Sequence, residues 1–210
     1  MCQSEAPKTC EGHDHREHHG HHGHHGHGPH GHHDHYCECH PEGRFTPGIE
    51  ISASYDLEYP EVPFPPTDFF ATVGEPAIRA LVLDHHTRLR ANPEIGHLFA
   101  KDDAVFAERV AKIADFVVEA CGGAPAYTTA EGRDVCIRTR HFPFDIDERA
   151  REIWLENLAK ALAASAFSAP ARKDYWTWME AYSVRMINRR RTKTQPLRFT
   201  YDEAKARWPG

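Results

Sequence analysis

The chain has 210 residues, 40% of them hydrophobic, and a formal net charge of −6 at pH 7, which suits one domain with polar tails. This acidic balance gives no reason to expect nucleic acid as a partner. No apolar run is long enough to span a bilayer, and the N-terminus has no apolar signal core. We therefore expect a cytoplasmic protein with no membrane partner.

Histidine dominates the N-terminal segment, residues 1–44, because fourteen of the eighteen histidines precede residue 41. Histidine interrupted by glycine offers no apolar side chains for a core, so this segment is expected to be disordered without metal. Neutral imidazoles and thiolates favour Ni, Zn or Cu, and the spacing defines no single tetrahedral site, which predicts a multi-site chelator. The candidate ligands are His18, His19, His21, His22, His24, His25, His32, His33, Cys37 and Cys39.

A proline-rich stretch, residues 45–66, follows this tail and ends in E-Y-P-E-V-P-F-P-P. It is expected to be an extended linker with at most one short strand, near Glu50–Ser54. Two cysteines beyond the linker, Cys121 and Cys136, lie apart in apolar or helical surroundings, so we expect small buried side chains rather than a disulfide framework.

Helical periodicity begins at Thr67 and predicts a domain over residues 67–190. Pro76 suits the first turn of a helix that ends at Asn92, and a tight corner follows. A second helix is predicted from a cap at Asp102 or Asp103 to the Gly122-Gly123 pair. The apolar stripe of the first helix, at three-to-four-residue spacing, includes two histidines: Ile78, Leu81, Val82, His85, His86 and Leu89.

The stretch from Arg138 to Trp154 carries the most informative motif, R-H-F-P-F around His141. Proline disfavours helix in the residue before it, so His141 should close a short helix. Asp145 or Asp147 caps the next helix, whose apolar stripe carries Trp154 and faces back toward His141. A last long helix should start near Pro170, and no strand alternation occurs in the domain. The sequence therefore predicts an all-α fold.

Three arginines, residues 189–191, follow this last helix and are expected to form a solvated helix end. They begin a polar C-terminal tail, residues 191–210, for which the pattern predicts no structure or role.

The R-H-x-P-F motif, with a tryptophan thirteen positions after the histidine, resembles the proximal-histidine segment of the group II truncated haemoglobins. The resemblance extends from about Thr67 to Asn188. It implies a two-over-two helical sandwich around haem b, with His141 as the axial iron ligand and Trp154 in the distal pocket. It also implies that Arg140 and Lys112 meet the haem propionates and that Phe99 packs on the haem face.

The same resemblance assigns the remaining distal positions. Ile113 matches an apolar distal residue and Arg109 a gate residue one turn earlier. Because the chain is two residues longer than the family pattern between Phe99 and Phe116, the register of this helix is open. Three further residues are expected to form walls of the pocket: Phe144, Tyr127 and Val110.

His86 is the main departure from the family pattern, which usually has a tyrosine there. A histidine could donate an N–H to bound oxygen, or it could bind the iron as a sixth ligand. His85 could also turn inward in its place, since both lie near the edge of the stripe.

Two functions follow from these features. The first is a haem protein that binds oxygen or another diatomic ligand, with nitric oxide dioxygenase or peroxidase-like chemistry as an extension. Such turnover would need electrons from a separate reductase, since we see no flavin or nicotinamide domain. The alternative is a metal-storage or metal-sensing protein that acts through the histidine-rich tail.

Overall fold

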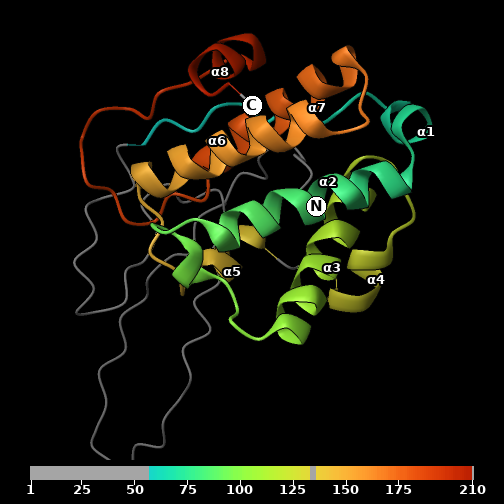
Figure 1. Ribbon diagram of the computed structural model, residues 1–210, viewed down its shortest axis with the longest axis horizontal. Helices are drawn as coiled ribbons and strands as arrows, with labels where there is room; N and C mark the ends of the chain where they lie inside the picture. Colours follow the sequence, from blue (N-terminus) through green and yellow to red (C-terminus); the bar gives the residue numbers. More distant parts are fainter. Residues whose placement is uncertain (1–56, 133–135, 210) are drawn as a thin grey trace, which may run out of the picture.

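The computed structural model describes residues 57–132 and 136–209 (Figure 1). The predicted metal-binding tail and the strand near residues 50–54 lie outside these ranges. Within them the structure is all-helical, with no strand. The helices are α1 (Phe69–Val73), α2 (Glu75–Ala91), the 3-10 helix η2 (Gly96–Leu98), α3 (Asp103–Ala120), α4 (Ala126–Glu131), α5 (Ile137–His141), α6 (Glu148–Ala164), α7 (Ala169–Val184) and α8 (Tyr201–Arg207).

Two long helices begin at one of the two caps that the sequence offers for each. The Asp102 carboxylate accepts the Val105 N–H at the start of α3, and the Asp147 carboxylate accepts the Ala150 N–H at the start of α6. Pro170 lies in the first turn of α7, where its missing N–H costs no hydrogen bond. Side-chain caps of this kind satisfy backbone donors that the helix itself leaves unpaired.

Two crossed pairs of helices build the fold. Helix α2 packs on α3 and on α6, and α6 packs on α7. Figure 1 shows α6 and α7 together on one side of the molecule, with α2 and α3 on the other. The main core lies between them and buries two indoles, Trp176 and Trp178, at 1% and 0% exposure. Burial of these apolar side chains drives the helices together, because a single helix cannot bury its own apolar stripe.

Two short helices were not predicted. Helix α4 lies between the Gly122-Gly123 pair and the His141 segment, and α8 lies in the C-terminal segment. Helix α8 begins with a capping box of Thr200 and Glu203 and buries Tyr201 and Ala204. It packs against α6 and α7, and Figure 1 shows it beside them. Its seven residues are too few to give a clear hydrophobic period.

Helix α7 ends at Val184, before the predicted end at Asn188. Of the arginines that follow, Arg190 is only 5% exposed, and its Nε lies 3.2 Å from a Glu148 carboxylate oxygen. The expected solvated helix end is therefore wrong for Arg190, because the acidic start of α6 packs beside it. The flanking ion pairs join Arg189 to Asp145 and Arg191 to Asp147.

Residues 57–66 have no regular structure but lie against the helices. Leu57 is buried with Val184 and Ile187, and the Tyr59 hydroxyl accepts a hydrogen bond from Arg138 at 2.6 Å. Among the helices of the described ranges, none has the length and apolar character to cross a membrane.

Candidate functional site

A cavity of about 460 Å³ opens between the two helix pairs, within the ~300–1,000 Å³ typical of cofactor and ligand sites. Its walls are mainly apolar and come from the helices α2 to α7 and the corner after α2. The structure brings together around it every pocket residue named from the sequence: His85, His86, Phe99, Arg109, Val110, Lys112, Ile113, Tyr127, Arg140, His141, Phe144 and Trp154.

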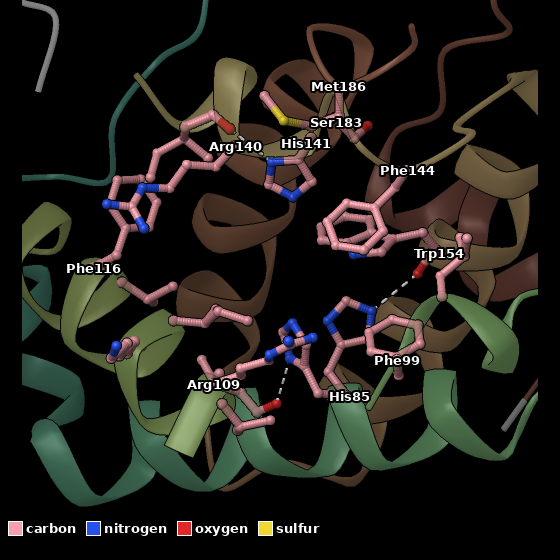
Figure 2. Close-up of a pocket in the computed structure, with 18 of the residues that line it drawn as sticks. His85, Phe99, Arg109, Phe116, Arg140, His141, Phe144, Trp154, Ser183 and Met186 are labelled. Carbon is pink, nitrogen blue, oxygen red and sulfur yellow. Dashed lines mark hydrogen bonds between the residues drawn. The ribbon is translucent and has the colours of Figure 1, made fainter. Parts of the chain in front are cut away.

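His141 enters the cavity from the end of α5, opposite His85 (Figure 2). Its Nδ1 lies 2.7 Å from the Ile137 carbonyl oxygen. A carbonyl only accepts, so Nδ1 carries the proton and Nε2 keeps its lone pair. Burial lowers the pKa of His141 below its usual value, and the bond to Ile137 only partly opposes this effect. The ring is therefore a neutral imidazole of the tautomer that binds a metal through Nε2.

His86 lies on α2 and is 9% exposed. Its Nδ1 lies 2.8 Å from the Val82 carbonyl oxygen, one turn earlier in the helix. By the same argument Nδ1 carries the proton and Nε2 is a lone-pair acceptor. Burial lowers the pKa of His86 to about 4, with a further small contribution from His141. His86 is thus neutral near pH 7, and its Nε2 offers no proton to a ligand.

His85, the neighbouring histidine, makes a different contact. Its Nε2 lies 3.1 Å from the Trp154 carbonyl oxygen, shown as a dashed line in Figure 2. Its ring packs edge-on against the Trp154 indole with centroids 4.6 Å apart. Burial, and secondly the nearby His86, lower the pKa of His85 well below its usual value. His85 therefore supports the tryptophan while it also lines the cavity.

Aromatic side chains line the cavity beside the histidines. Phe99 lies in the corner after η2, with its ring centroid 6.3 Å from that of His86. Phe144 lies 6.5 Å from His141 by the same measure. Figure 2 shows Phe99, Phe144 and Trp154 around one end of the opening. Flat apolar walls of this kind suit a planar ring system.

The cations predicted at the cavity edge share one carboxylate that the sequence did not indicate. Arg140 Nη2 lies 2.6 Å from one oxygen of Glu131, and Lys112 Nζ lies 3.6 Å from the other. Lys112 also pairs with Glu108 at 3.3 Å. Arg109 extends from α3 toward the cavity (Figure 2). The edge therefore carries three cationic side chains and one acid, Glu131, that lines the cavity with them.

Sequence reasoning missed several residues of the cavity. Glu131 ends α4, a helix that was not predicted, so no pattern linked it to the site. Ser183 and Met186 lie near His141 in Figure 2 and line the cavity. Helix α7 also lines the cavity through Tyr175, Met179 and Tyr182, and the spacing of these residues alone does not distinguish a core face from a cavity face.

These features fit haem, the cofactor that the resemblance implies. A neutral imidazole lone pair in the cavity, that of His141, would bind the iron of such a group. The apolar and aromatic walls of the cavity match a porphyrin, and the cations at its edge match two carboxylate substituents. The residues that would hold the group are His141 on the iron, Phe99 and Phe144 on the ring, and Arg140 and Lys112 on the carboxylates.

Comparisons with known proteins agree with this fit. The model of the bacterial-like globin family matches residues 68–188. The structure is similar to phosphate-bound Hell's gate globin IV, with a TM-score of 0.68 and 40% identity over 73% of this chain and 94% of that chain. A search of curated proteins found no match.

Group II truncated haemoglobins are also similar. That of Bacillus anthracis has a TM-score of 0.53 and 25% identity over 58% of this chain and 96% of its own. The truncated oxygen-avid haemoglobin of Bacillus subtilis has a TM-score of 0.53 and 25% identity over 57% of this chain and 98% of its own. The chain therefore belongs to the bacterial-like globin family, and it is a haem-binding globin with the truncated haemoglobin fold.

Proposed function

We propose that this globin binds a diatomic ligand such as oxygen, with His141 as the axial ligand of haem b. The observation that carries the proposal is the hydrogen bond from His141 Nδ1 to the Ile137 carbonyl, because it leaves Nε2 unprotonated in the cavity opposite the distal residues. Haem supplies, when bound, the iron at which such a ligand coordinates. A similar structure is named for an oxygen-avid haemoglobin, which favours oxygen as the ligand to test first.

The distal residues would contact this ligand in different ways. Trp154 lines the cavity, and its indole N–H is a donor that cannot accept. We therefore assign the hydrogen bond to a bound diatomic ligand to Trp154, held in place by His85. Ile113 and Phe99 keep the surroundings apolar, which strengthens such a bond by excluding water.

The tautomer of His86 determines which interactions its Nε2 can make in the cavity. Its proton is on Nδ1 and directed at Val82, so Nε2 cannot donate to oxygen as a tyrosine hydroxyl would. Two roles remain for this lone pair: binding the iron as a sixth ligand, or accepting a proton. The donor role expected as one alternative from the sequence is therefore disfavoured.

The unprotonated Nε2 of His86 is the observation that favours peroxide chemistry as a second function, because this nitrogen can accept a proton. A neutral His86 can take a proton from hydrogen peroxide, and the cationic Arg109 lines the same cavity and stabilises negative charge that develops on the remaining oxygens. Reduction of peroxide to water, like repeated oxidation of nitric oxide, consumes electrons. We propose that a separate reductase supplies them.

Absorption spectra of the full chain reconstituted with haem b test these assignments. The ferrous protein should bind oxygen reversibly, and His141→Gly should lose the axial imidazole and recover it from added imidazole. A low-spin, six-coordinate ferric spectrum that His86→Leu converts to high spin would make His86 a ligand. A high-spin wild type whose reaction with peroxide slows about 100-fold in His86→Leu would make it the base. Ferrous protein that binds no oxygen overturns the proposal.

We also propose that the histidine-rich segment binds Ni, Zn or Cu. Support comes from the sequence alone, in which imidazoles and two close thiolates, Cys37 and Cys39, are concentrated before residue 41. Calorimetric titration of the full chain with Zn²⁺ and Ni²⁺ tests it, with a variant in which the tail histidines are replaced by asparagine as control. Equal binding by the two proteins would reject the segment as a metal site.

A further inference from the structure

The chain turns sharply between α5 and α6, directly after His141. Helix α5 ends at His141, and α6 starts after the cap at Asp147. The His141 carbonyl accepts the Phe144 N–H at 3.1 Å, which closes a local turn around Pro143. Further along the corner, the backbone of Ile146 is bonded to residues 188 and 189. Contacts that hold this corner in place therefore also orient the side chain of His141.

Asn188 supplies that support from beyond the end of α7. Its side chain Nδ2 donates to the His141 carbonyl oxygen at 2.9 Å, and its Oδ1 accepts the Ile146 N–H at 3.1 Å. Its backbone N–H donates to the Ile146 carbonyl oxygen at 2.9 Å. Asn188 thus bonds both ends of the corner, His141 and Ile146, with three hydrogen bonds.

The surroundings of Asn188 make these bonds difficult to replace. The residue is 4% exposed, and its neighbour Ile187 is fully buried. A buried backbone donor without a partner costs about 1–3 kcal/mol. Loss of the Asn188 side chain takes the acceptor from the Ile146 N–H, whereas the His141 carbonyl keeps its bond from Phe144. The corner is therefore fixed relative to α7, which itself lines the cavity through Ser183.

We propose that Asn188 is a positioning residue that orients His141 for the iron. The hydrogen bond of His141 Nδ1 to Ile137 fixes the imidazole ring, and the bond from Asn188 fixes the backbone of the same residue. Together they hold the ligand at both ends. Partners of this kind orient a metal ligand and raise its affinity without touching the metal. The proposal rests on the role of His141 proposed above.

Two substitutions separate the contact to His141 from the rest of the corner. Asn188→Asp keeps the size of the side chain and the acceptor for the Ile146 N–H, but it places an oxygen against the His141 carbonyl. Asn188→Ser keeps a small polar side chain that is too short to bridge both groups. Asn157→Ala is the control, because Asn157 Nδ2 also donates to a backbone carbonyl, that of Ile153 at 2.8 Å, and it does not line the cavity.

The test uses the full chain loaded with haem and two readouts besides activity. Resonance Raman spectroscopy of the ferrous protein without added ligand gives the iron–histidine stretching band, and transfer to excess apomyoglobin gives the rate of haem loss. Asn188→Asp and Asn188→Ser should shift or broaden the band and speed haem loss about 10-fold or more. Asn157→Ala should change neither.

An iron–histidine band and a haem loss rate equal to those of wild type in folded Asn188→Asp would overturn the proposal. Circular dichroism establishes whether each variant keeps its helices, and Asn188→Ser decides the question if the aspartate variant does not fold. His141→Gly with added imidazole separates the two claims. If the wild-type band survives in that variant without imidazole, His141 is not the ligand and the proposed function fails first.

Discussion

The ring of His85 packs edge-on against the indole of Trp154, and its Nε2–H donates to the carbonyl oxygen of the same tryptophan at 3.1 Å. The two side chains therefore behave as one unit. His86, the next residue, directs its proton into its own helix and its lone pair stays available. Adjacent histidines thus have separate tasks: one supports the tryptophan and the other offers a base or a ligand.

Substitution of the two histidines should reveal this division. His85→Leu removes this hydrogen bond and the edge-on ring contact, while the Trp154 carbonyl keeps its N–H partner within α6. We therefore expect a loss of about 0.5–1.5 kcal/mol in the free energy of unfolding and faster oxygen dissociation, because the indole is less well held. His86→Leu should instead change the coordination state of the iron or the rate with peroxide. Stopped-flow oxygen release and urea unfolding measure the two effects of His85→Leu. The ferric absorption spectrum and the rate with peroxide measure those of His86→Leu. A change in ferric spin state in His85→Leu alone would reverse the two assignments.

Stability should fall in mild acid because the pocket histidines are buried as neutral rings. The pKa of His86 is lowered from 6.5 to about 4 by burial. Below pH 6.5 the unfolded chain binds a proton that folded His86 does not, so stability present above pH 6.5 is lost as the pH falls toward 4. Each such histidine contributes a slope of at most about 1.4 kcal/mol per pH unit. The lowered pKa values of His85 and His141 act in the same direction.

Urea unfolding of the haem-loaded wild type and of His86→Leu, from about pH 7 to about pH 5, isolates the His86 contribution, since His85 and His141 are present in both proteins. The free energy of unfolding should fall less steeply with falling pH in His86→Leu than in the wild type. Parallel curves for the two proteins would mean that His86 titrates at its usual pKa in the folded state.

Glu131 should weaken the hold of the protein on haem. It pairs with both Arg140 and Lys112, the two cations that we assign to the haem carboxylates. Glu131→Gln frees Arg140 from this pair and leaves Lys112 paired with Glu108 alone, so haem loss to apomyoglobin should slow by up to about fivefold, because partly exposed ion pairs are worth about 0–1 kcal/mol. Glu108→Gln is the control, since Glu108 pairs with Lys112 but not with Arg140. Faster haem loss in Glu131→Gln would show instead that Glu131 orients the cations.

Local patterns in the sequence were sufficient to predict most of the fold. The caps at Asp102 and Asp147 and the apolar stripes of α2, α3 and α6 depend on neighbours within a few residues, so they can be read directly from the sequence. The R-H-F-P-F motif placed His141 at the end of a short helix in the same way. The pocket residues themselves came from the family resemblance, and no spacing alone would have grouped Phe99 with Trp154.

Contacts between distant segments could not be predicted. Asn188 reaches His141 across 47 positions, and Arg190 pairs with Glu148 across 42. Nothing near Asn188 in the sequence distinguishes it from an exposed asparagine after a helix. The tautomer of His85 likewise depends on its contact with the Trp154 carbonyl, and this contact is set by the packing of α2 on α6.

The C-terminal segment should be required for stability, because it completes a buried ion pair. Arg151 and Glu180 are 4% and 3% exposed and meet at 2.6 Å. Arg151 also donates to the Leu197 carbonyl at 2.8 Å, and Arg198 contacts the other side of the Glu180 carboxylate at 2.6 Å. The residues after α7 thus supply the remaining polar partners that two buried charges need.

Removal of one charge should therefore cost more than removal of both. Arg151→Met leaves Glu180 buried with only the partly exposed Arg198, and we expect a loss of about 3–5 kcal/mol in the free energy of unfolding. Arg151→Met combined with Glu180→Met should recover a large part of that loss, since apolar side chains of similar size need no partner. Arg198→Met should cost about 1 kcal/mol or less, because Arg198 is 45% exposed. Urea unfolding of the four proteins measures these differences. A double variant no more stable than Arg151→Met would mean that the packing of α6 on α7, rather than the charge of Glu180, determines the cost.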